Sequence, residues 1–215
     1  MAIYLAIVLS LKLMAQVKQL LEAMDHQGWA VFPDFMGQPE SRRLRDECEL
    51  SSTRGEFKRA GIGRGMATEI REDIRSDQIM WLETSEAASE QHAYLAKLEE
   101  LRLAFNERFF LGLFDFEGHF AFYPEGGFYK PHLDRHAGSS ERILTIILYL
   151  NEDWQTGDGG ELKLWKTCGE KTGPFEVIEP RLGTLVCFHS GDHWHEVLPA
   201  IKPRRSITGW FRQRP

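Results

Sequence analysis

The sequence predicts an α+β protein with a mainly β core, a double-stranded β-helix (jelly roll) supported by N-terminal helices. Before residue 119, apolar residues recur mostly at helical spacing, whereas from residue 119 onward short apolar runs alternate with turns rich in Gly, Pro and Asp. Short strands at such regular spacing are typical of sandwiches and barrels. No internal repeat or linker divides the 215 residues, so we expect one domain, with 1–118 as mainly helical support and 119–213 as the jelly-roll core.

The first part of the chain combines helical segments with two short strands. Val17, Leu20 and Met24 have helical spacing and precede Gly28, and Pro39 suits the first turn of a second helix. The expected helices cover 14–26, 39–51 and 89–110, the expected strands cover 29–32 and 79–82, and 57–65 is expected to be a mobile loop. The glycines of that loop lack the Lys-Ser/Thr ending of a phosphate-binding loop, so no nucleotide is expected there.

Residues 2–13 form an apolar run interrupted only by Ser10 and Lys12. The run is too short to cross a membrane, and no Lys or Arg precedes it as in a signal peptide. We therefore expect an extra N-terminal helix or a frayed tail, and no membrane partner. A translation start at Met14 is an alternative.

The β-rich part contains seven short apolar runs that we expect to be strands. They read HFAFY, ERILTIILYL, GGELKLW, FEVIEP, GTLVCFH, HEVLP and RSITGWF.

Composition excludes some classes of protein. The net charge of -6 and the pI near 5.8 argue against a nucleic-acid scaffold, which would carry a basic surface. Cys48, Cys168 and Cys187 are odd in number, widely spaced and without a CxxC motif, which argues against a disulfide framework or a zinc site. Unpaired cysteines fit a reducing, cytoplasmic compartment.

Candidate metal ligands lie in the segment YPEGGFYKPHLD, which ends in His132-Leu133-Asp134. On a strand, positions i and i+2 share a face, so His132 and Asp134 would project together and Leu133 would enter the other layer. Two His and one carboxylate form the facial ligand set of non-haem iron oxygenases. The third ligand would come from a distant strand, and His195 and His193 are both candidates.

The last predicted strand, in RRSITGWF, carries a candidate anion-binding residue. Alternation places Arg204, Ser206, Thr208 and Trp210 on one face and turns Arg205 to the other. Arg is always charged and can bind a carboxylate through two hydrogen bonds. Arg204 is therefore a candidate partner for a carboxylate ligand.

Five segments resemble the Fe(II)/2-oxoglutarate oxygenases of the prolyl 4-hydroxylase superfamily: YPEGGFYKPHLD, ILTIILYLNEDW, GDGGELKLW, IEPRLGTLVCF and HEVLPAIKPRRSITGWF. Within that superfamily the chain is most similar to the oxygen-sensing (HIF-type) prolyl hydroxylases and their bacterial relatives, over roughly residues 70–211. The resemblance implies a jelly roll that uses Fe(2+), O2 and 2-oxoglutarate, with ascorbate as a reductant. It also implies that the products are succinate, carbon dioxide and a hydroxylated substrate.

The resemblance also implies roles for individual residues. His132, Asp134 and His195 would bind iron, because HEVLP matches the family at the third ligand, and Arg204 would bind the distal carboxylate of 2-oxoglutarate. Further cosubstrate contacts would come from Tyr149, Thr208, Ile147, Leu162 and Tyr123.

Arg142, Tyr129 and Trp210 would face the substrate, and the basic loop 54–65 would close over it. The implied partner is a protein with an exposed prolyl loop, and we expect a cytoplasmic monomer that binds neither nucleic acid nor membrane. Spacing near Tyr123 and before Arg142 differs by one residue from the animal enzymes, which leaves the substrate open. Alternatives are an oxygenase of the same fold acting on another amino acid, a small molecule or an alkylated base, and a non-catalytic metal-binding jelly roll.

Overall fold

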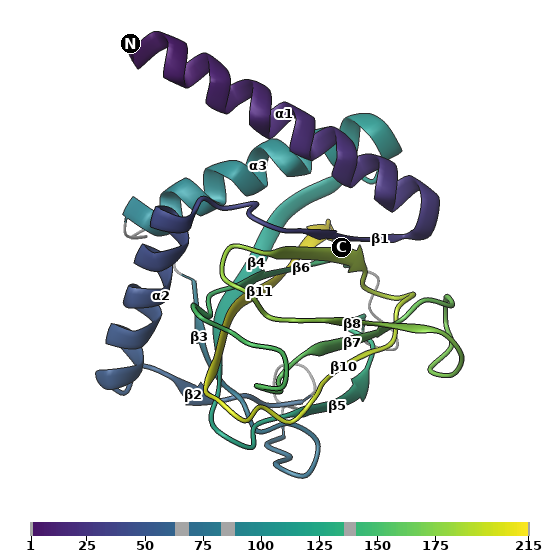
Figure 1. Cartoon of the computed structure of the whole chain (residues 1–215). Helices are drawn as coiled ribbons and strands as arrows, with labels where there is room; N and C mark the ends of the chain where they lie inside the picture. The colour runs from purple at the N-terminus through teal and green to yellow at the C-terminus, as the bar shows by residue number, and fades with distance from the viewer. Residues whose placement is uncertain (1, 63–68, 83–88, 136–140, 215) are drawn as a thin grey trace.

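The structure is a computed structural model, and it describes residues 2–62, 69–82, 89–135 and 141–214. Three helices precede most of the β structure (Figure 1): α1 Ala2–Gln27, α2 Gln38–Thr53 and α3 Ser89–Phe109. α1 and α2 contain the expected helices 14–26 and 39–51, and α3 ends one residue before the expected end at 110. α1 begins well before Met14. α1 ends at Gln27, and the next residue, Gly28, has a φ of 77° in the left-handed region that glycine adopts without strain. Within the described residues, no helix has both the length and the hydropathy needed to cross a membrane.

Two antiparallel sheets form the jelly roll, as the fold class predicted. The larger sheet has the strand order β1-β9-β6-β11-β4-β3-β2. Its strands are β1 Trp29–Phe32, β2 Lys58–Arg59, β3 Gln78–Trp81, β4 Leu113–Tyr123, β6 Arg142–Tyr149, β9 Leu185–His189 and β11 Arg204–Gln213. The smaller sheet has the order β5-β10-β7-β8, with β5 Tyr129–His132, β7 Leu162–Trp165, β8 Phe175–Ile178 and β10 His195–Val197.

Residues before 119 were expected to be mainly helical support, but they also contribute strands to the large sheet. β1, β2 and β3 all belong to the large sheet, and β4 already begins at Leu113. The expectation of a loop throughout 57–65 is wrong at Lys58–Arg59, because these residues pair with Ile79 and Gln78 of β3. Residues 63–65 lie outside the described residues. The assignment of the whole chain to one domain stays a prediction.

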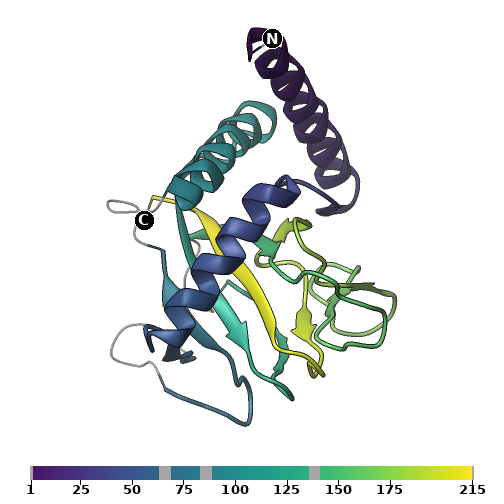
Figure 2. The same ribbon diagram turned by 60° about the vertical axis from the view of Figure 1, so that its left-hand side comes forward.

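The helices pack on the outer face of the large sheet, and Figure 2 shows α2 lying across that face. The apolar cluster there joins Leu20 of α1, Leu44 of α2 and Phe105 of α3 to Ile207 and Phe211 of β11. A second cluster lies between the two sheets and joins residues such as Val186 and Phe188 to Leu162 and Leu164. β11 therefore has one face in the helical core and the other toward the small sheet, as alternation predicted.

Ile207→Ala should lower the free energy of unfolding by about 2–5 kcal/mol, because the side chain is fully buried under the helices and its loss leaves a cavity. Ile201→Ala is the matched control: Ile201 is 62% exposed, so its loss should change stability by no more than about 0.5 kcal/mol. Chemical denaturation measures both. If both variants lowered the free energy of unfolding equally, the assignment of the Ile207 face of β11 to the core would be contradicted.

Candidate active site

The inner face of the large sheet arranges the site in rows, because β4, β11 and β6 pair in register. Moving along β11, every second residue faces the interior between the sheets. The cross-strand rows are Arg204 with Tyr123; Ser206 with Ala121 and Tyr149; Thr208 with His119 and Ile147; Trp210 with Glu117 and Thr145; and Arg212 with Asp115 and Arg142. Arg204 is 1% exposed whereas Arg142 is partly exposed, so the rows run from the deep end of the site to its mouth.

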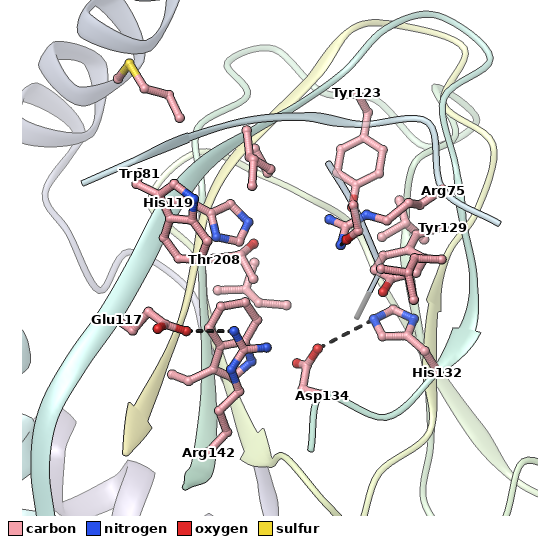
Figure 3. A pocket seen from close by; sticks show the side chains of 18 of the residues that line it. Arg75, Trp81, Glu117, His119, Tyr123, Tyr129, His132, Asp134, Arg142 and Thr208 are labelled. Atoms are coloured by element: carbon pink, nitrogen blue, oxygen red, sulfur yellow. Dashed lines mark hydrogen bonds and ion pairs between the residues drawn. The ribbon is translucent and has the colours of Figure 1, made fainter. Parts of the chain in front are cut away.

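A group of three potential metal ligands lies on the small-sheet side of this interior. His132 and His195 are direct partners across β5 and β10, and Asp134 follows β5. His132 Nε2 lies 3.6 Å from Asp134 Oδ1 (Figure 3). His195 Nε2 lies 3.5 Å from Asp134 Oδ2. The three ligand atoms lie within 4.8 Å of one another, which suits a single divalent ion.

In both histidines the Nδ1 atom has a backbone partner, which leaves Nε2 to bind a metal ion. His132 Nδ1 lies 2.8 Å from the carbonyl oxygen of Lys130, and His195 Nδ1 lies 3.1 Å from that of His193. A carbonyl can only accept a hydrogen bond, so each Nδ1 carries a proton, and in the neutral ring each Nε2 keeps a lone pair toward the group. This is the arrangement of metal-bound histidines, whose outer nitrogen donates to a backbone carbonyl or carboxylate.

Asp134 is held by residues that the sequence analysis assigned no role. Its Oδ2 accepts a hydrogen bond of 2.8 Å from Thr145 Oγ1, which also lies 2.9 Å from Ser190 Oγ. Burial raises the pKa of Asp134, but the neighbouring imidazoles of His195 and His132 and the Thr145 hydrogen bond outweigh it and lower the pKa to about 2. The carboxylate is thus charged and oriented at neutral pH.

Two details of the ligand segment differ from the strand geometry that was expected. β5 ends at His132, so Asp134 is placed by the backbone rather than by strand alternation: its N–H donates to the carbonyl of Ser190. Leu133 lines the same cavity as the ligands and does not enter the other layer.

His193 precedes β10, and its Nδ1 lies 3.0 Å from the carbonyl oxygen of Trp165. A methyl group added to Gly28 would meet His193 Nε2, so this imidazole lies against Gly28, away from the ligand group.

Arg204 is a buried cation at the deep end of the cavity. Its Nε donates to the carbonyl of Gly160 at 2.8 Å, and its Nη1 lies 3.3 Å from Ser206 Oγ. Among the described residues no carboxylate lies within ion-pair distance of it, and its Nη2 makes no hydrogen bond. Burying an unpaired charge costs several kcal/mol, so the site calls for an anionic ligand.

Tyrosines flank this guanidinium. Its Cζ lies 4.9 Å from the ring centre of Tyr123 and 5.0 Å from that of Tyr149. Tyr149 is fully buried, and its hydroxyl makes no hydrogen bond of ordinary geometry among the described residues. Burial raises its pKa to about 12, although the neighbouring Arg204 opposes the rise. The Tyr149 ring packs against the Arg204 guanidinium and supports it from behind the cavity wall. Tyr149 is the one predicted site residue that does not reach the cavity wall.

The other predicted residues all border one cavity of about 700 Å³. Ile147 and Leu162 supply apolar wall from the two sheets, and Thr208 a hydroxyl. At the mouth, Arg142 Nη2 donates to Glu117 Oε1 at 2.6 Å, and the guanidinium lies 3.4 Å from the ring centre of Trp210. Of the basic loop, the described residues Glu56, Lys58, Arg59, Gly61 and Ile62 border the cavity.

His119 and Arg75 also border the cavity, and the sequence analysis assigned them no role. His119 lies between the rings of Trp81 and Trp210, at 5.0 and 5.5 Å between ring centres, and its Nδ1 has no partner among the described residues. Burial lowers the pKa of His119 to about 3, so the ring is neutral. Strand alternation could have found His119, which shares a face with Tyr123. Arg75 could not be found in this way because it precedes β3.

Comparison with known proteins identifies the family. Residues 118–212 match the model of the 2OG-Fe(II) oxygenase superfamily. The structure resembles a prolyl-4-hydroxylase from Pseudomonas putida with a TM-score of 0.83 and 40% identity, covering 93% of this chain and 100% of that one. The chain therefore belongs to the 2OG-Fe(II) oxygenase superfamily, and its fold and donor set agree with that family.

Two further relatives are a solved structure and a curated protein. A prolyl hydroxylase from Trichoplax adhaerens, solved with a peptide fragment of the hypoxia inducible factor oxygen degradation domain, has a TM-score of 0.80 and 26% identity over 94% of this chain and 91% of that chain. Egl nine homolog 1 of Homo sapiens is 30% identical over 203 residues, which is 91% of this chain and 46% of that protein. The chain thus spans about half the length of this curated relative.

The ligand geometry predicts which histidine matters. His195→Ala should abolish binding of a divalent ion such as Mn²⁺, because only two ligands remain. His193→Ala should retain it, because that imidazole faces the Trp165 carbonyl. Titration calorimetry on the metal-free protein measures both. Retained binding in His195→Ala together with loss in His193→Ala would show that His193 is the ligand.

Proposed function

We propose that this protein is an Fe(II)- and 2-oxoglutarate-dependent prolyl hydroxylase acting on an exposed prolyl loop of a protein. The observation that carries the proposal is the pairing of two features in one cavity: a group of two histidines and one aspartate, and a buried arginine without a carboxylate partner among the described residues. A metal-binding scaffold would not require the arginine.

The ligand group fits ferrous iron. Neutral imidazoles and a charged carboxylate are the donors of the facial triad, which leaves the remaining metal positions open. His132, Asp134 and His195 would hold the ion, with Thr145 orienting the carboxylate. When bound, iron supplies the oxidising chemistry that converts O2 and 2-oxoglutarate into succinate, carbon dioxide and a hydroxyl group on the substrate.

The deep end of the cavity fits the distal carboxylate of 2-oxoglutarate. Arg204 offers charge and an unused Nη2, and Tyr149 packs against its guanidinium from behind the cavity wall. Leu162 and Ile147 provide an apolar wall for the methylene carbons, and Thr208 and Tyr123 complete the pocket. Burial excludes water, so the charged hydrogen bonds of Arg204 act in a medium of low dielectric constant and bind the anion more strongly than in solvent.

The remaining volume supports a macromolecular substrate. A cavity of about 700 Å³ exceeds what a five-carbon diacid fills, and its mouth is bordered by Arg142, Trp210 and Tyr129. A prolyl residue has a fixed φ, which lowers the conformational entropy lost when a loop enters such a mouth. The two relatives described as prolyl hydroxylases with solved structures support proline as the residue modified.

Three further features belong to the proposal. Free Cys48, Cys168 and Cys187 fit a cytoplasmic protein, where thiols stay reduced. The proposal also includes a monomeric state and, from the family resemblance, the use of ascorbate as a reductant.

Arg204→Ala should weaken 2-oxoglutarate binding by about 2–5 kcal/mol, because a buried carboxylate loses its charged partner. Arg205→Ala is the control. Arg205 points to the helical side of β11, where its Nη2 lies 3.4 Å from Glu49 Oε1, so its loss should leave the affinity close to that of the wild type. Titration calorimetry with Mn²⁺ present measures both. Equal effects of the two changes would contradict the placement of the cosubstrate.

Arg142→Ala should impair hydroxylation of prolyl substrates while leaving Mn²⁺ and 2-oxoglutarate affinity nearly unchanged. Glu117 still accepts a hydrogen bond of 2.7 Å from Arg212 in this variant, so its carboxylate does not lose its only cationic partner. The measurement is mass spectrometry of a proteome incubated with wild-type, Arg142→Ala or inactive His195→Ala protein, scoring the gain of one oxygen on proline. Oxygen found on another residue, or 2-oxoglutarate binding weakened as much as in Arg204→Ala, would contradict the prolyl assignment.

A further inference from the structure

The ligand His132 lies in a three-layer stack. The ring of Tyr129 lies on its imidazole with ring centres 3.5 Å apart and planes 16° from parallel. The guanidinium of Arg75 lies 4.3 Å from the centre of the Tyr129 ring. Figure 3 shows Arg75, Tyr129 and His132 together at one side of the cavity. The stack therefore joins a cation, a phenol and a ligand imidazole.

A bulge in β5 makes the stack possible. Tyr129 and His132 are three positions apart, so a regular strand would place them on opposite faces. Their partners on β10 are Val197 and His195, only two positions apart, and the register shifts between them. One extra residue on β5 thus turns both rings to the same face, which is how bulges redirect side chains near active sites.

Arg75 is itself fixed from two directions. Its Nε and Nη2 donate to the two oxygens of Asp77 at 2.7 and 2.6 Å, and the Asp77 side chain is fully buried. The backbone beside it is bonded to β5, because Lys130 N donates to the carbonyl of Ile74 and Ser76 N to that of Phe128. The backbone that carries Arg75 is therefore hydrogen-bonded directly to the strand that carries His132.

We propose that Arg75, held by Asp77, is a positioning residue for the metal ligand His132 and acts through the Tyr129 ring. The inference rests on the proposed metal centre and adds residues outside the ligand set. His132 needs such support more than its partners do, because its side chain is 16% exposed, against 4% for His195 and 9% for Asp134.

His132 needs this support because its imidazole ring could otherwise tilt. Its hydrogen bond to the Lys130 carbonyl fixes Nδ1 but still allows the ring to tilt about that bond. The Tyr129 ring closes one side, and Arg75 holds Tyr129 through a cation–π contact. Asp77 neutralises the guanidinium, so the stack brings little net positive charge toward a divalent ion.

A second Arg–Asp pair with the same spacing provides a matched control. Arg71 donates to both oxygens of Asp73 at 2.9 and 3.0 Å, as Arg75 does to Asp77, but both side chains are exposed. Arg71 makes no recorded contact with an aromatic ring of the described residues. If the stack supports the metal ligand, removing the Arg75–Asp77 pair should weaken metal binding and removing the Arg71–Asp73 pair should not.

The test uses the full chain stripped of metal and titrated with Mn²⁺, without 2-oxoglutarate. Arg75→Met/Asp77→Leu should raise the Kd for Mn²⁺ about tenfold, the lower end of the losses seen when residues supporting a metal ligand are changed. It removes both charges, and replacing a buried ion pair by apolar residues is often neutral or stabilising. Arg71→Met/Asp73→Leu should keep the wild-type Kd. The visible absorption of bound Co²⁺, which reports ligand geometry, should change only in the first variant.

Variants of Tyr129 test whether the effect passes through the ring. Tyr129→Leu should raise the Kd about as much as the Arg75 variant, and Tyr129→Phe, which keeps the stacked ring, should raise it much less. Combining Tyr129→Leu with the Arg75 variant should add less than a factor of two, because both remove the same support. Should the Arg75 variant fail to fold, the difference between Leu and Phe at Tyr129 still decides.

Three results would overturn the inference: a Kd for the folded Arg75 variant within twofold of the wild type, an equal rise in the Arg71 control, or fully additive effects with Tyr129→Leu. A wild-type chain that binds no Mn²⁺ would overturn the metal centre itself, and with it the role of Arg75. If the variants change the Kd for Mn²⁺ as predicted but no oxygen is transferred to proline, the role of Arg75 is supported and only the proposed substrate is contradicted.

Discussion

Arg204 carries its charge into the interior of the protein without a carboxylate partner among the described residues, and the rest of the site is arranged around this constraint. A cation in that position is tolerated only if something else balances it, and the structure supplies a carbonyl, a hydroxyl and two aromatic faces, which are dipoles rather than charges. The balance is left incomplete. A dianionic cosubstrate completes it, so binding that molecule both fills the cavity and relieves the cost of burial.

The polarity of the cavity changes along β11. The deep end holds the buried charge of Arg204, and the middle row holds Thr208, His119 and Ile147. At the mouth, Arg142 pairs with Glu117, and Arg212 pairs with Glu117 and Asp115. The unpaired charge of Arg204 thus lies where a small anion must be held. A compensated mouth binds by shape, hydrogen bonding and aromatic contact, which suits a polypeptide of variable charge.

The sequence predicted what depends on local periodicity. Alternation in RRSITGWF assigned Arg204 and Arg205 to opposite faces, and the structure agrees. It could not predict features that depend on how separate strands meet. The bulge that stacks Tyr129 on His132 is visible only in the pairing of β5 with β10. Arg75 lies outside any strand, and His193 differs from His195 because β10 begins only at His195. The placement of Tyr149 behind the cavity wall likewise follows from packing and not from spacing.

The position of β11 in the large sheet has a consequence for how the protein is made. β11 lies between β4 and β6, yet it follows every other strand in the chain. While a ribosome synthesises the preceding residues, β4 and β6 each present an unpaired edge toward the gap that β11 will fill. Open edges invite pairing with other chains. The nascent protein must therefore remain unfinished in the centre of its sheet until the segment with Arg204 emerges, so closure of the sheet and completion of the anion site are one event, and protection by a chaperone would be most useful just before it.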